Sequence, residues 1–127
     1  MTLSDCTILI IDDASAIRDY LRQTLQQLDI RRVQEAATGE QGISLFKQQH
    51  HDVIFLDIEL PDANGQTLLK EIKDIEEAAH VVMITAHNTV ENVQQSIIAG
   101  ASGFVAKPFS PQKIKNIIER CMAPKFS

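Results

Sequence analysis

Five polar side chains lie directly after short apolar runs of this sequence, at positions that could bring them together. Three are carboxylates, one is a hydroxyl and one is an ammonium group: Asp12, Asp13, Asp57, Thr85 and Lys107. If the runs are parallel strands, their carboxyl ends meet at one edge of a sheet, where ligands bind in open α/β folds. Three converging carboxylates repel one another unless a cation lies among them. The spacing therefore predicts a cation-dependent site.

Phosphoryl transfer is the chemistry that suits this set. Lys107 supplies one positive charge, and Mg²⁺, which prefers carboxylate, carbonyl and water oxygens, supplies the rest. No histidine or cysteine pair has zinc spacing, which excludes a zinc site. A carboxylate can itself be the nucleophile and form an acyl phosphate. Asp57 is the candidate, because Asp12 and Asp13 are adjacent and resemble metal ligands, and Thr85 could donate a hydrogen bond to a phosphoryl oxygen.

The elements that must position these residues are visible as apolar and β-branched runs. Three of the runs are continuously apolar, as strands covered on both faces are, and the second is polar enough to lie at an edge. We expect strands at residues 7–11, 32–36, 53–56, 81–84 and 103–106. Helical patterns separate them, so the sequence predicts an α/β fold with a doubly wound, five-stranded parallel sheet and right-handed crossovers.

Apolar residues at helical spacing indicate which face each helix buries. In the fourth helical segment the predicted stripe is Val90, Val93 and Ile97. Thr38, followed three residues later by Gln41, and Ser110 before a proline are expected helix starts. We expect residues 123–127 to be a tail or the start of a linker, and we place His50, His51 and His80 at the surface.

Composition fits one domain over residues 1–127 and excludes several functions. A chain of 127 residues suits a single hydrophobic core, and its formal net charge of −5 disfavours direct binding to nucleic acid. The longest apolar run is far too short to cross a bilayer, so we expect no membrane association and a cytoplasmic location. Cys6 and Cys121 stand in apolar surroundings and are expected to be buried thiols.

Four short motifs, in order and at strand ends, resemble those of response-regulator receiver domains of two-component signalling. They are Ile11-Asp12-Asp13, Leu56-Asp57, Ile84-Thr85-Ala86 and Lys107-Pro108-Phe109. The resemblance covers nearly the whole chain, which is similar in length to the single-domain chemotaxis members. It implies a flavodoxin-like sheet of order 2-1-3-4-5 with helices on both faces.

The resemblance also implies roles for individual residues. Asp13, Asp57 and the backbone carbonyl of Glu59 would bind Mg²⁺, with Asp12 acting mainly through bound water. Asp57 would accept a phosphoryl group from the phosphohistidine of a histidine kinase or a histidine phosphotransfer protein. Thr85 would then move inward and Phe104 would turn into the space it leaves. The Lys107–Pro108 bond is expected to be cis, as in the family.

Those movements would switch the surface formed by the fourth helix, fifth strand and fifth helix. Its partner would be a downstream target protein or a C-terminal output domain outside this chain. The chain would phosphorylate and dephosphorylate only itself, so we do not class it as an enzyme. Glu59 and His87 flank the path of the hydrolytic water in the family, and we expect them to set the lifetime of phosphorylated Asp57.

Two alternatives remain. One is a receiver-like binding module that is never phosphorylated, although the acids, the acceptor and the lysine are all present. The other is a Mg²⁺-dependent phosphohydrolase, because Asp57-Ile58-Glu59 loosely resembles the Asp-x-Asp motif of haloacid-dehalogenase enzymes. That motif normally follows the first strand of a longer chain with a cap domain. A flavin protein of the same fold is disfavoured by the acidic turn after the first strand.

Overall fold

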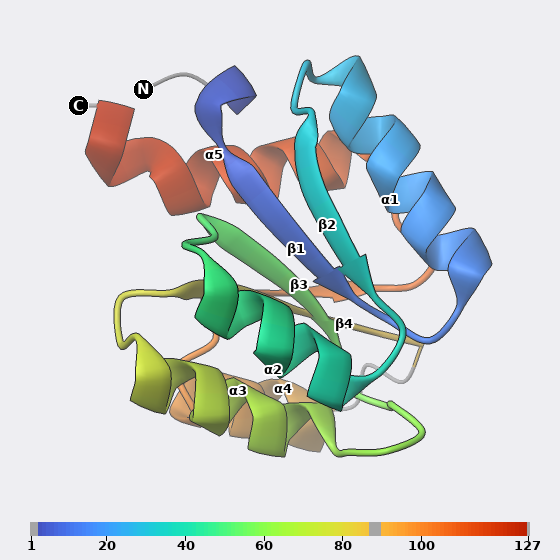
Figure 1. The fold of residues 1–127 in the computed structure, drawn as a ribbon, viewed down its shortest axis with the longest axis vertical. Helices are drawn as coiled ribbons and strands as arrows, with labels where there is room; N and C mark the ends of the chain where they lie inside the picture. Colours follow the sequence, from blue (N-terminus) through green and yellow to red (C-terminus); the bar gives the residue numbers. More distant parts are fainter. Residues whose placement is uncertain (1–2, 87–89, 127) are drawn as a thin grey trace.

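The computed structural model describes residues 3–86 and 90–126, which form one open, twisted sheet of five parallel strands (Figure 1). The strand order is β2-β1-β3-β4-β5 and every neighbouring pair is parallel, which confirms the predicted doubly wound topology. The strands are β1 (Thr7–Ile11), β2 (Arg32–Ala36), β3 (Val53–Asp57), β4 (His80–Thr85) and β5 (Gly103–Ala106).

Helices cover both faces of the sheet (Figure 1). Alternate residues of each strand point to opposite faces, so Ile8 and Ile10 pack beneath α1 and α5, whereas Leu9 and Ile11 pack beneath α2 and α3. The sheet is therefore buried on both sides, which explains its continuously apolar strands. After a short 3-10 turn, η1 (Leu3–Asp5), the helices are α1 (Ser15–Gln27), α2 (Gly39–Gln48), α3 (Gly65–Ile75), α4 (Val90–Ile98) and α5 (Pro111–Phe126).

The boundaries of the strands and helices agree with those predicted from the sequence, except at a few positions. β3 extends one residue further than expected, to Asp57, and β4 runs from His80 to Thr85. Two site residues are therefore the last residues of their strands, where backbone pairing fixes them more firmly than a loop would. The Thr38 hydroxyl accepts a hydrogen bond from the backbone N–H of Gln41 at 3.1 Å, which confirms that helix start.

The predicted buried stripe of α4 is wrong at its last member. Ile97 is 64% exposed and the neighbouring Ile98 is 85% exposed, whereas Ser96 is fully buried. Successive helical residues differ by about 100° in direction, so with Ser96 facing inward the next two side chains point outward. The side chains of Val90 and Val93 lie outside the described part of the chain.

Residues 123–126, part of the segment expected to be a tail or the start of a linker, are helical, because α5 continues to Phe126. Cys121 and Met122 pack into the core on that face of the sheet, and this burial holds the last turns of the helix in place. Ser127 lies outside the described residues. Cys6 and Cys121 are buried free thiols, as expected.

His51 is buried, contrary to the surface position we expected. Its Nε2 lies 2.8 Å from Gln34 Oε1 on β2, and its ring stacks on Phe46 with centroids 6.0 Å apart. His51 lies two residues before β3, and its contacts with Phe46 and Gln34 keep the ring inside the protein. Its neighbour His50 remains largely exposed.

This buried histidine predicts a pH dependence of stability. Burial lowers the pKa of the His51 imidazole below its ordinary value of 6.5, and the charge of His50 acts in the same direction. Below about pH 6.5 the unfolded chain takes up a proton that the folded protein resists, so the free energy of unfolding falls as the pH drops. The slope from this one residue is at most about 1.4 kcal/mol per pH unit.

We therefore expect His51→Gln to flatten the pH dependence of stability between about pH 7 and pH 5, whatever it does to stability at neutral pH. Urea denaturation at each pH measures this directly. His50→Gln is the matched control, because that neighbouring ring is exposed, and it should keep most of the slope. Equal pH dependence in wild type and His51→Gln would contradict the prediction.

Candidate functional site

Asp57 ends the central strand β3 with its carboxylate almost fully buried. The backbone N–H of Glu59 donates to its Oδ1 at 3.1 Å. Burial raises the pKa of the Asp57 carboxyl, and the charges of Asp12 and Asp13 add to this, although the Glu59 N–H and Lys107 oppose it. Asp57 is thus a desolvated carboxylate at the carboxyl edge of the sheet.

Asp12 and Asp13 follow β1 and lie beside Asp57. One carboxylate oxygen from each of the three residues lies within 4.8 Å of the others. Asp12 is fully buried, and its Oδ1 accepts a hydrogen bond from the N–H of Ala14 at 2.8 Å. Asp13 is exposed at the mouth of the site. The structure therefore brings together all three acids that the sequence selected.

Lys107 supplies a positive charge to this acidic cluster. Its Nζ lies 2.9 Å from Asp12 Oδ2 and 3.5 Å from Asp57 Oδ2. Burial lowers the pKa of Lys107, but the hydrogen bond and charge of Asp12, with Asp57, outweigh it and leave the pKa raised. Lys107 is therefore a cation at neutral pH. The Lys107–Pro108 peptide bond is cis, as the resemblance implied.

The remaining predicted residues lie around this centre. Thr85 is fully buried at the end of β4, and its backbone carbonyl accepts from the N–H of Lys107 at 2.7 Å. Phe104 on β5 is partly buried against the core beneath α2 and α3. The side chain of Glu59 is exposed, and its backbone pairs with Asn64 in an isolated antiparallel bridge. His87 lies outside the described residues.

A family model described as the response regulator receiver domain matches residues 8–119 of this chain. The chain belongs to the response-regulator receiver family. The match runs from β1 into the middle of α5 and so spans all five strand-end residues that the sequence selected.

Known proteins similar to this receiver domain include chemotaxis regulators. Chemotaxis protein CheY of Bacillus subtilis is 34% identical over 115 residues, which are 91% of this chain and 96% of that protein. The structure of CheY4 of Vibrio cholerae has a TM-score of 0.86 at 26% identity and covers 91% of this chain and 98% of that one. The BeF3-activated receiver domain of DrrB, a Thermotoga maritima regulator, has a TM-score of 0.84 at 30% identity, with 97% and 99% covered.

The acidic cluster of this receiver domain fits a bound cation. Three carboxylates share a small volume with one lysine, so negative charge remains in excess. The single Lys107 ammonium is shared between buried Asp12 Oδ2, at 2.9 Å, and Asp57 Oδ2, at 3.5 Å. Carboxylate and carbonyl oxygens are the ligands that hard divalent ions take. These residues form a carboxylate pocket suited to such an ion.

Two residues with contacts around the receiver site, Asp62 and Arg18, were missed by sequence reasoning. Asp62, in the loop after β3, accepts from the N–H groups of Gly39 and Glu40 at 2.9 and 3.1 Å, and these bonds lower the pKa of its carboxyl. It ties that loop to the start of α2. Arg18 on α1 donates to the carbonyl of Asp12 at 2.7 Å. No local motif marks either contact, because each depends on how a helix packs on the sheet.

Proposed function

We propose that this chain is a phosphoacceptor in a two-component system or phosphorelay, with Asp57 receiving the phosphoryl group. The observation that carries the proposal is the position of Asp57, whose carboxylate lies among Asp12, Asp13 and the Lys107 ammonium. The donor would be the phosphohistidine of a histidine kinase or histidine phosphotransfer protein. Residues 1–127 would act as one receiver domain.

In this reaction an oxygen of Asp57 attacks phosphorus, the P–N bond to the donor imidazole breaks, and an acyl phosphate forms on Asp57. Lys107 would stabilise the negative charge of the phosphoryl oxygens, and the Thr85 hydroxyl would donate a hydrogen bond to one of them. The Asp57 carboxylate is largely shielded from water, so Lys107, 3.5 Å from its Oδ2, would help to balance its charge. Each residue acts from a strand end or directly after one.

The cation that fits this site is Mg²⁺. Asp13, Asp57 and the backbone carbonyl of Glu59 would hold it, and Asp12 would act mainly through a bound water. When bound, Mg²⁺ neutralises charge on the phosphoryl oxygens as the group is transferred. Asp12 keeps Lys107 in reach of Asp57, so the lysine and the ion would share the charge of the phosphoryl group.

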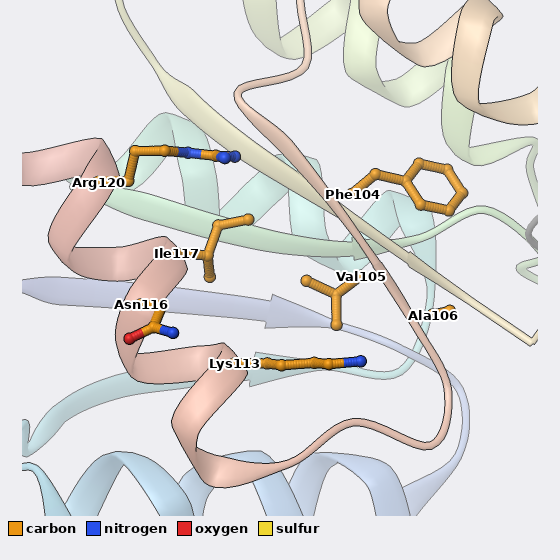
Figure 2. A pocket seen from close by; sticks show the side chains of 7 residues that line it. All are labelled: Phe104, Val105, Ala106, Lys113, Asn116, Ile117 and Arg120. Carbon is orange, nitrogen blue, oxygen red and sulfur yellow. The ribbon is translucent and has the colours of Figure 1, made fainter.

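Phosphorylation would be read out on the surface formed by α4, β5 and α5. A hollow of about 420 Å³ lies there between β5 and α5, lined in part by Lys113, Asn116 and Arg120 (Figure 2). Phe104 lies on the side of β5 that faces away from α5 (Figure 2). Inward movement of Thr85 would change the space open to Phe104 and hence the shape of this surface.

The partner on this surface would be a downstream target protein or a C-terminal output domain. The formal net charge of −5 argues against direct binding to nucleic acid. Across the residues that the structure describes, no helix has the length and apolar character needed to cross a membrane. A cytoplasmic location is part of this proposal.

Loss of the phosphoryl group would be hydrolysis of the acyl phosphate by water. The exposed side chain of Glu59 lies two residues after the acceptor, at the open side of the site, and we propose that Glu59 and His87 tune this step. Both reactions occur on the chain's own aspartate, so the protein would be a signalling domain with no separate substrate.

Intact mass spectrometry after incubation with acetyl phosphate and Mg²⁺ tests the proposal. We expect wild type to gain the mass of one phosphoryl group, and Asp57→Asn to gain none, because the amide cannot form the acyl phosphate. Chelating the metal should prevent the gain. Asp74→Asn is the matched control, since this exposed aspartate on α3 is remote from the site, and it should behave as wild type.

The alternatives make different predictions. A binding module that is never phosphorylated would show no adduct under any condition. A phosphohydrolase, given a phosphate monoester in place of acetyl phosphate, would hydrolyse it continuously, with release of inorganic phosphate far beyond one equivalent. Either result would contradict the proposed function.

A further inference from the structure

A second hollow lies beside the lysine of the site, between α1 and the segment that follows β5. Its volume is about 280 Å³, and it is lined by Ala16, Ile17 and Tyr20 from α1 and by Lys107, Pro108 and Phe109. The two walls come from opposite ends of the sequence. Helix α1 therefore faces the segment that carries Lys107.

Tyr20 closes this hollow with a hydrogen bond across it. Its hydroxyl donates to the backbone carbonyl of Phe109 at 2.9 Å, joining residues 89 positions apart. The two rings also contact each other, with centroids 5.6 Å apart and planes tilted by 56°. The Tyr20 ring is 39% exposed, whereas Phe109 is buried in the core. The hydroxyl thus binds the backbone of a residue whose side chain lies in the core.

The backbone that follows the lysine is also anchored at the two ends of the segment, and the Phe109 ring packs in the core. The N–H of Lys107 donates to the Thr85 carbonyl at 2.7 Å, which holds the first residue of the segment to β4. Pro108 has no N–H to donate. Ser110 already belongs to the start of α5, where its hydroxyl accepts from Lys113 at 3.3 Å. Between these anchors, the bond from Tyr20 holds the segment to α1.

Helix α1 also holds the partner of the lysine. Arg18, two residues before Tyr20, donates to the backbone carbonyl of Asp12 at 2.7 Å. One turn of α1 therefore contacts two backbone carbonyls around the ion pair between Lys107 and Asp12. One is the carbonyl of Asp12 itself, and the other is that of Phe109, two residues after Lys107. Lys107 Nζ and Asp12 Oδ2, the two charged atoms of that pair, lie 2.9 Å apart.

We infer that Tyr20 is a positioning residue for phosphoryl transfer, which fixes the Lys107 segment to α1 and so keeps the lysine within reach of Asp57. The inference rests on the proposed function. Through the contact between Tyr20 and Phe109, a partner that shifts α1 would also shift the segment that carries Lys107.

The variant that isolates the hydroxyl is Tyr20→Phe, which retains the ring and its contact with Phe109. We expect its phosphorylation by acetyl phosphate and Mg²⁺, timed by intact mass, to be about two- to tenfold slower than wild type, the range set by one net hydrogen bond. Ile17→Val is the control for packing in the same hollow, because it changes an apolar wall without touching a hydrogen bond. Thermal unfolding verifies that each variant is folded.

A double-mutant cycle distinguishes positioning from a general structural effect. If Tyr20 acts through Lys107, adding Tyr20→Phe to Lys107→Ala should slow the reaction no further. Equal slowing in both backgrounds would overturn the inference, and so would an unchanged rate in Tyr20→Phe alone. Absence of any adduct on wild type would overturn the proposed function and this inference with it. An adduct that forms equally fast on wild type and Tyr20→Phe overturns the inference alone.

Discussion

Gly65→Ala is expected to lower the free energy of unfolding by about 3 kcal/mol and to stop phosphorylation of Asp57. A Cβ at position 65 would lie 2.4 Å from the backbone oxygen of Asp57 and 2.5 Å from the Cα of Ile58. Those atoms belong to the end of β3 and the residue after it, so they cannot move aside without displacing the phosphoacceptor. Urea denaturation measures the first effect, and intact mass after acetyl phosphate treatment measures the second.

Gly39→Ala is the matched control, because Gly39 and Gly65 are each the first residue of a helix and each follows a capping side chain. A Cβ at position 39 would meet the end of the Leu68 side chain at 2.7 Å, which can rotate away. We expect a loss of only about 1 kcal/mol there, with phosphorylation intact. If both variants lost the same stability, the crowding at Asp57 would not be the cause.

Lys107→Ala is expected to slow phosphorylation of Asp57 by about a hundredfold, the typical effect of removing one preorganised charge from a transition state. Its ammonium group is the described cation nearest the acceptor, 3.5 Å from Asp57 Oδ2, and it also neutralises buried Asp12. Without it, the phosphoryl oxygens would enter a cluster of carboxylates compensated by the metal alone. The rate of adduct formation with acetyl phosphate and Mg²⁺ measures this.

Two comparisons sharpen the lysine experiment. Lys70→Ala removes an exposed lysine on α3 and should leave the rate unchanged, which excludes a general effect of net charge. Lys107→Arg keeps the charge with a bulkier planar group and should fall between alanine and wild type. A rate for Lys107→Ala within twofold of wild type would show that Asp57 does not need this cation.

The sequence by itself determined the α/β fold and which polar residues lie at the carboxyl edge of its sheet. Apolar runs that alternate with helical patterns are a property of each segment, and a parallel sheet necessarily gathers the carboxyl ends of its strands at one edge. Asp12, Asp13, Asp57, Thr85 and Lys107 could therefore be selected without coordinates. The N-terminal cap of α2 could also be predicted from the local sequence, because Thr38 and its hydrogen-bond partner Gln41 are three residues apart.

Only the tertiary structure decided how those residues are held. The contact from Tyr20 to Phe109 and that from Arg18 to Asp12 depend on the height and rotation of α1 on the sheet, which no local pattern encodes. The outward rotation of Ile97 was likewise set by how α4 packs, and the burial of His51 by its place against Phe46. Sequence patterns specify which face of an element is apolar. Packing between elements fixes where each element lies, and individual hydrogen bonds depend on that position.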